Sequence, residues 1–195
     1  MLETNKKQIL YSQEGSDDLL LIEDELESVQ PEDNWKVLVV DDEVEIHNVT
    51  QLALKNFTFE RKPLCLISAY STEQAKQLIQ SHPDIALVLL DVVMEKDNSG
   101  LDVVNYIRSS LKNDSVQIIL RTGQPGKCPE NRVIFNYAIN DYKTKTELTK
   151  SKLVTALVTA LRTYGAMTKL DSSKAQMEKR AEESKKLYQK SKNYS

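Results

Sequence analysis

The chain has 195 residues, of which 40% are hydrophobic, and a formal net charge of −3. This length suits one ordinary domain with appendages, and the charge excludes a protein that is basic throughout, as many nucleic-acid-binding domains are. Two cysteines, no apolar signal segment and no apolar run of about 18 residues argue against a disulfide framework, a zinc site and a membrane span, so we expect a cytoplasmic protein.

Charge is concentrated at the two ends of the chain. Residues 1–34 carry ten acidic residues against two lysines, and residues 166–195 carry eight basic residues against four acidic ones. The first segment also lacks sustained hydrophobic periodicity, so we interpret it as a mostly disordered acidic arm. We expect a central domain over 35–165 and, over 166–195, a helical tail with a weak coiled-coil heptad pattern.

The central domain alternates buried strands with amphipathic helices. Short apolar runs predict strands at 35–40, 64–69, 85–90, 116–120 and 139–142. Helical spacing predicts helices at 44–57, 72–82, 101–111 and 131–138, and a long helix from 148 to about 190. The alternation predicts an α/β fold, a doubly wound sheet of five parallel strands with helices on both faces.

The last of these helices would be about 60 Å long at 1.5 Å per residue, which is longer than the domain is wide. Its apolar stripe from Leu153 to Tyr164 can cover a sheet, but the stripe decays beyond Met167. We therefore expect its distal half to pair with a partner, to pair with a second copy of the chain, or to fray.

Polar residues stand where four of the predicted strands end. Asp41 and Asp42 follow the first strand, Asp91 the third, Thr122 the fourth, and Lys145 comes just after the fifth. The carboxyl ends of parallel strands share one edge of a sheet, where α/β proteins place their sites. The sequence therefore predicts three carboxylates, a hydroxyl and an ammonium at one edge.

Such a cluster favours a metal-assisted phosphoryl site. Two carboxylates about 4 Å apart repel each other by roughly 4 kcal/mol at an effective dielectric of 20, which a bound cation offsets. An all-oxygen site suits Mg²⁺, whose open positions could accept phosphoryl oxygens, while Lys145 and Thr122 hold others. A carboxylate can itself form an aspartyl phosphate. The alternative is a charge cluster that serves only the structure.

The pattern resembles the receiver domain of bacterial two-component response regulators, similar to the chemotaxis receiver. The matching motifs are VLVVDDE at 37–43, LLD at 89–91, LRTG at 120–123 and DYKTK at 141–145. The resemblance implies the flavodoxin-like receiver fold over residues 35 to about 165. It also implies a phosphoprotein that accepts a phosphoryl group from a sensor histidine kinase or a phosphotransfer protein.

The resemblance further implies a role for each residue of the acidic site. Asp91 would be the phosphoacceptor. Mg²⁺ would be bound by Asp42 directly, by Asp41 through water, by Asp91, and by the backbone carbonyl of Val93.

The remaining motif residues would form the switch. Thr122 would move toward the phosphoryl group, Lys145 would bind it, and Tyr142 would follow inward as the switch aromatic. The surface of the fifth strand and the last helices would change, and a homodimer through the last helix and tail is a candidate output. We expect no direct contact with nucleic acid or membrane.

A closer resemblance is to receivers fused to HD-GYP cyclic-di-GMP phosphodiesterases. It rests on the acidic arm and on the segments DVVME at 91–95, ILRTGQPG at 119–126 and NDYKTKTEL at 140–148. His47 and His82 form no His-Asp pair. We therefore expect this chain to lack the phosphodiesterase domain, as either a stand-alone relative or a fragment.

Two alternatives differ in function. A pseudo-receiver would use the same fold only for dimerisation or scaffolding, without phosphorylation. A phosphatase of the haloacid dehalogenase type would need a second aspartate two residues after the nucleophile, as general acid, and Val93 stands there.

The resemblance to receivers implies that Val93 and Gln124 stand at the two positions that tune the rate of dephosphorylation in this family. Because Val93 cannot orient a water molecule, we expect any intrinsic phosphatase activity to be slow. Val93→Asn should then accelerate the loss of phosphate, followed as the decay of the labelled protein. An unchanged decay rate would contradict this prediction.

Overall fold

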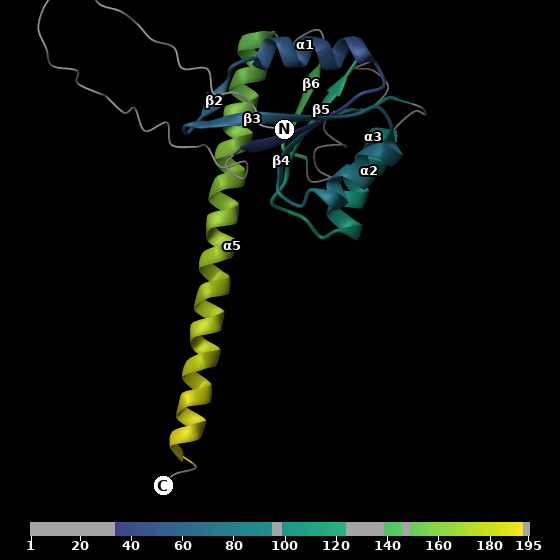
Figure 1. Cartoon of the computed structure of the whole chain (residues 1–195). Coiled ribbons are helices and arrows are strands. Elements are labelled where there is room, and N and C mark those ends of the chain that lie inside the picture. The colour runs from purple at the N-terminus through teal and green to yellow at the C-terminus, as the bar shows by residue number, and fades with distance from the viewer. Residues whose placement is uncertain (1–33, 95–98, 124–138, 146–148, 193–195) are drawn as a thin grey trace, which may run out of the picture. The chain divides into compact units, whose positions relative to one another are not determined.

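The computed structural model describes residues 34–94, 99–123, 139–145 and 149–192, with a sheet at their centre (Figure 1). Its strands are β1 (Trp35–Val40), β2 (Thr58–Phe59), β3 (Lys62–Ala69), β4 (Ile85–Asp91), β5 (Gln117–Thr122) and β6 (Asp141–Thr144). They lie in the order β2-β3-β1-β4-β5-β6, and all neighbours are parallel except β2 and β3. The predicted sheet of five parallel strands is confirmed.

The described helices alternate with these strands as the periodicity predicts. They are α1 (Val44–Leu54), α2 (Thr72–Ser81), α3 (Ser99–Asn105), the π-helical segment η1 (Tyr106–Ser110) and α5 (Lys150–Lys192). The predicted helix at 131–138 and nearly all of the acidic arm at 1–34 lie outside the described residues.

Two apolar layers enclose the sheet, with β4 buried along its whole length. One layer joins the sheet to α2, α3 and η1, and it includes Leu90, Ile79 and Val104. The other joins the sheet to α1 and α5 through Leu89 and the α5 leucines. Both faces of the central strands are covered, which explains why their sequences are apolar without alternation.

The hairpin of β2 and β3 is absent from the sequence-based prediction. Its two-residue turn consists of Glu60 and Arg61, whose φ angles of 50° and 63° lie in the left-handed region. Such turns usually carry Asn or Gly, whose presence is the signal in a sequence. Neither residue occurs here, so the hairpin had no local signature.

The buried face of α1 also differs from the apolar spacing, which includes Ile46 and Val49, that predicts this helix. Val49 is 63% exposed, whereas His47, Thr50 and Leu54 are the buried residues of this helix. The helix therefore turns a partly polar face toward the sheet, next to the predicted site.

Helix α5 extends well past the sheet. Its first half packs Leu153, Leu157 and Leu161 into the core, while the described side chains from Lys169 to Lys186 are all exposed. Its 43 residues make it about 65 Å long at 1.5 Å per residue. No described helix is both long and apolar enough to cross a membrane.

Candidate functional site

The predicted acidic residues meet at the carboxyl edge of the sheet. Asp41 and Asp42 follow β1, and Asp91 is the last residue of β4 beside it. The strand order reverses direction at β1, so this is the topological switch point where open α/β sheets bind ligands. Carboxylate oxygens of Asp41, Asp42, Glu43 and Asp91 lie within 4.8 Å of one another.

The ammonium of Lys145 connects three of these carboxylates. Its Nζ atom lies 2.9 Å from Asp91 Oδ2, 3.2 Å from Asp41 Oδ2 and 2.7 Å from Glu43 Oε1. Burial alone would lower the pKa of Lys145, but hydrogen bonds to Glu43 and Asp91 and the nearby carboxylate charges raise it above its usual value. Lys145 is therefore a cation at every physiological pH.

Asp91 is buried and close to like charge. Only 3% of its surface is exposed, and its Oδ1 atom accepts a hydrogen bond from the backbone N–H of Val93 at 3.3 Å. Burial raises the pKa of this carboxyl, and the charge of Asp41 adds to the effect, while Lys145 opposes it. The carboxylate is thus poorly solvated, with its charge balanced mainly by one lysine.

The donor set fits a hard divalent cation. All four clustered groups are carboxylates, and among the described residues the buried Asp41 Oδ2 has ion pairs to Lys145 and Arg121 but no hydrogen bond. Few carboxylates with room for water are the ligands that Mg²⁺ prefers. Asp41, Asp42 and Asp91 are therefore the residues that would hold it, and Glu43 is an acid that the sequence analysis had not assigned.

The remaining predicted residues lie around this cluster. Thr122 ends β5, is 1% exposed, and accepts a hydrogen bond at its carbonyl from the Lys145 N–H at 2.8 Å. Val93 is half-buried directly after Val92. Tyr142 is 5% exposed and belongs to the apolar layer of α2 and α3. Its side chain is already buried in this structure. The inward movement of Tyr142 upon phosphorylation therefore stays a prediction.

His47 supports the site in a way that the sequence analysis missed. Its Nε2 atom lies 2.8 Å from the carbonyl oxygen of Asp41, which can only accept, so Nε2 carries the proton. Its Nδ1 atom lies 3.0 Å from Ser68 Oγ, and Tyr70 covers the ring with centroids 4.4 Å apart. The buried face of α1 thereby fixes the backbone that carries Asp41.

Arg121 is a second residue without a predicted role. It is 4% exposed, with Nη1 donating to Thr50 Oγ1 at 3.2 Å and Nη2 lying 3.5 Å from Asp41 Oδ2. Burial lowers the pKa of this guanidinium, against the charges of Asp41 and Asp91, yet an arginine stays cationic. An arginine within an otherwise apolar strand signals a buried partner, and that signal was available in the sequence.

Gly100 brings α3 against the backbone of Asp91. A Cβ atom at this position would lie 2.0 Å from the carbonyl oxygen of Asp91. The Gly100 N–H instead donates to the carbonyl of Val92 at 3.1 Å. Glycine is required here for close approach rather than for a turn.

The central part of the chain matches a known protein family. Residues 37–158 match the response regulator receiver domain. The chain belongs to this family. It is therefore a receiver of the response regulators of two-component signalling, and an acidic pocket that binds Mg²⁺ is a general feature of such domains.

A curated relative supports the assignment to this family. The 3'3'-cGAMP-specific phosphodiesterase 2 of Vibrio cholerae serotype O1 is 49% identical over 140 residues, which are 72% of this receiver chain and 27% of the relative. The chain thus spans about a quarter of that relative's length. The expected relationship to receivers carried by cyclic-dinucleotide phosphodiesterases is confirmed, although the dinucleotide named for this relative is 3'3'-cGAMP.

Solved receiver structures share the fold. The signal receiver domain of an HD domain-containing protein from Pseudomonas fluorescens Pf-5 has a TM-score of 0.60 at 24% identity, covering 70% of this chain and 93% of that one. A receiver domain protein from Clostridium thermocellum has a TM-score of 0.57 at 21% identity, covering 68% and 98%.

The raised pKa of Asp91 predicts that removing this charge stabilises the folded chain near neutral pH. The folded receiver binds a proton at Asp91 more tightly than the unfolded chain does, so the stability from this group is lost as the pH rises through the folded pKa. In EDTA, Asp91→Asn should therefore raise the melting temperature near neutral pH by about 2–4 °C, the shift for about 1 kcal/mol at this length. The gain should vanish near pH 4.

Asp84 at the other end of β4 provides the control for this measurement. Burial would raise the pKa of Asp84, but Lys36, 2.6 Å away, holds it below its ordinary value. Asp84→Asn should therefore not raise the melting temperature. A gain for Asp91→Asn that persists at pH 4 would contradict the assigned cause.

Proposed function

We propose that this receiver accepts a phosphoryl group on Asp91 from a phosphohistidine and passes the change to the surface formed by β6 and α5. The observation that carries the proposal is the 2.9 Å contact between Lys145 Nζ and Asp91 Oδ2 inside a cluster of four carboxylates. A purely structural cluster would not need to concentrate like charge around one buried carboxylate.

The chemistry is a phosphoryl transfer between two nucleophiles. An oxygen of Asp91 attacks phosphorus, the P–N bond of the phosphohistidine breaks, and the imidazole leaves with the electron pair of that bond and takes up a proton. Mg²⁺, when bound, supplies charge neutralisation for the phosphoryl oxygens. Lys145 balances the remaining negative charge, and Thr122 donates a hydrogen bond to a phosphoryl oxygen.

The new charge alters the partners of Lys145. An aspartyl phosphate carries more negative charge than the free Asp91 carboxylate. Lys145 therefore leaves Glu43 and Asp41 for the phosphoryl group. Lys145 directly follows β6. Its movement therefore pulls on the edge strand of the sheet.

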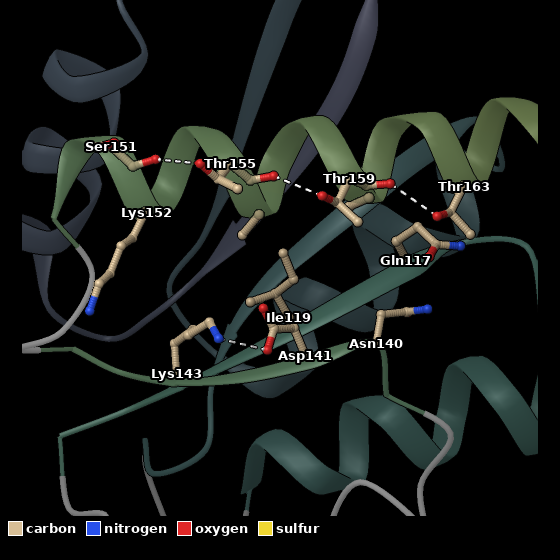
Figure 2. A pocket seen from close by; sticks show the side chains of 12 residues that line it. Gln117, Ile119, Asn140, Asp141, Lys143, Ser151, Lys152, Thr155, Thr159 and Thr163 are labelled. Atoms are coloured by element: carbon tan, nitrogen blue, oxygen red, sulfur yellow. Dashed lines mark hydrogen bonds and ion pairs between the residues drawn. The ribbon is translucent and has the colours of Figure 1, made fainter.

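A groove beside β6 is a surface whose shape would change when Lys145 moves this strand. It has a volume of about 550 Å³ and lies between β5, β6 and α5 (Figure 2). On the α5 side, the hydroxyls of Thr155, Thr159 and Thr163 each donate to a carbonyl one turn earlier at 3.0 Å. On the opposite side, Lys143 pairs with Asp141 at 3.1 Å (Figure 2).

Labelling tests the acceptor. The chain should be phosphorylated by acetyl phosphate and Mg²⁺, as measured by the mass of the intact protein, and Asp91→Asn should abolish the labelling because it removes the nucleophile. Asp84→Asn is the matched control, since Asp84 lies just before β4, 56% exposed, and should label normally. Retained labelling of Asp91→Asn would exclude this site, and an unlabelled wild type would favour the pseudo-receiver.

We also propose that two phosphorylated receivers pair through the distal half of α5. Leu170 and Met177 are 70% and 71% exposed, and their spacing of seven residues places them on one face of the helix. Large apolar side chains exposed in a row favour a covered surface. A second copy supplies the same row, in register, when the helices are parallel.

Light scattering after size exclusion tests this pairing. With beryllofluoride and Mg²⁺, the 22.2 kDa chain should double in mass, and Leu170→Glu with Met177→Glu should keep it monomeric. Ser172→Glu with Ala175→Glu adds the same charge on the opposite face and should still dimerise. Equal behaviour of the two double variants would contradict pairing through this stripe.

A further inference from the structure

A second cation, that of Arg121, lies next to the acidic site. Arg121 stands next to last in β5, an inner strand between β4 and β6. Its Nη2 atom lies 3.5 Å from Asp41 Oδ2, and Nη1 is anchored on α1 by the hydrogen bond to Thr50. The guanidinium is thus held in place and directed at one carboxylate of the cluster.

The contact between Arg121 and Asp41 is one of charge. Among the described residues, Asp41 Oδ2 and the Nε and Nη2 atoms of Arg121 are buried without a hydrogen-bond partner. Burying a guanidinium with unused donors is costly unless opposite charge lies close by. The acidic cluster supplies that charge, through Asp41 and through Asp91, which is the register partner of Arg121 in the sheet.

We infer that Arg121 is a permanent counter-ion of the acidic cluster, which partly takes the place of the divalent cation and so weakens the binding of that cation. The inference rests on the proposed metal-dependent phosphoryl function. Four carboxylates are balanced in this structure by Lys145 and Arg121. The positive charge that reduces their repulsion also repels an incoming Mg²⁺ by the same Coulomb rule.

The counter-ion matters most when Lys145 is engaged elsewhere. Asp41 is fully buried, with Lys145 Nζ at 3.2 Å and Arg121 as its ion-pair partners. Once Lys145 binds the phosphoryl group, Arg121 still faces Asp41. Arg121 touches no reacting atom, so it is a positioning residue and not a catalytic one.

Cation binding by the full chain tests the inference without any phosphoryl donor. Mn²⁺ affinity is measured by electron paramagnetic resonance and Mg²⁺ affinity by calorimetry, at fixed ionic strength. Arg121→Gln should bind both about tenfold more tightly, because a nearby positive charge is removed. Its melting temperature should fall in EDTA and should gain more from saturating Mg²⁺ than that of the wild type.

Arg108→Gln is the matched control. Arg108 donates to the carbonyls of Asn113 and Val116 at 2.6 Å and 2.9 Å, just before β5 and thus at the opposite end of this strand. Its replacement should lower the melting temperature equally with and without Mg²⁺, and should change the Mn²⁺ affinity less than about twofold. Arg121→Lys keeps the charge and should restore the wild-type affinity within about twofold.

Three results would overturn the inference. The first is an unchanged or weaker Mn²⁺ affinity of Arg121→Gln. The second is a loss of stability of equal size in EDTA and in Mg²⁺, which is the mark of a merely structural arginine. The third is a change in the Mn²⁺ affinity of Arg121→Lys larger than about twofold, which remains measurable if Arg121→Gln fails to fold. A wild-type chain that binds no Mn²⁺ would instead contradict the proposed function, and the inference with it.

Discussion

The structure depends on the attraction between Lys145 and three carboxylates at one edge of the sheet. Asp41 and Lys145 are 104 positions apart in the chain, yet their side chains are 3.3 Å apart at Asp41 Oδ1. The contact forms only when β1, β4, β5 and β6 are aligned with their carboxyl ends together. Without it, two carboxylates about 4 Å apart would repel each other by roughly 4 kcal/mol at an effective dielectric of 20.

The elements around the sheet hold this charge cluster by polar contacts as well as apolar ones. Helix α1 contributes His47, which bonds the Asp41 backbone, and Thr50, which holds Arg121. Helix α3 begins with Ser99 and Gly100, where the absence of a side chain allows contact with the Asp91 carbonyl. The buried face of α1 is therefore polar at the positions where an apolar stripe would ordinarily pack.

The sequence predicted what depends on pattern, and missed what depends on tertiary contact. Apolar runs without alternation predicted the parallel strands, and the shared edge then placed Asp41, Asp91 and Lys145 together. The apolar spacing around Val49 predicts the α1 helix but not its buried face, because burial there follows the hydrogen bonds of His47 and not hydrophobicity.

Local backbone geometry was hidden for a related reason. The turn at Glu60 and Arg61 adopts positive φ without the residues that normally announce it, so no short-range pattern could reveal the β2 hairpin. Similarly, the helix predicted over 101–111 becomes π-helical from Tyr106 onward, where the Leu111 N–H reaches back five residues to the Tyr106 carbonyl. The apolar spacing predicts which residues face the core, such as Ile107, but not the number of residues per turn.

The positions of the two cations in the sheet suit different tasks. Lys145 follows β6, which has a neighbour on one side only among the described strands, and its ammonium is shared among partners that include the exposed Glu43. Arg121 belongs to β5, which has neighbours on both sides, and its guanidinium is fixed by Thr50. A cation on an edge strand can change partners with little loss of packing, whereas one on an inner strand cannot. In a phosphoryl switch, the lysine that binds the phosphoryl group must be able to change partners, as Lys145 can. The cation that stays paired with Asp41 must instead be fixed, as Arg121 is.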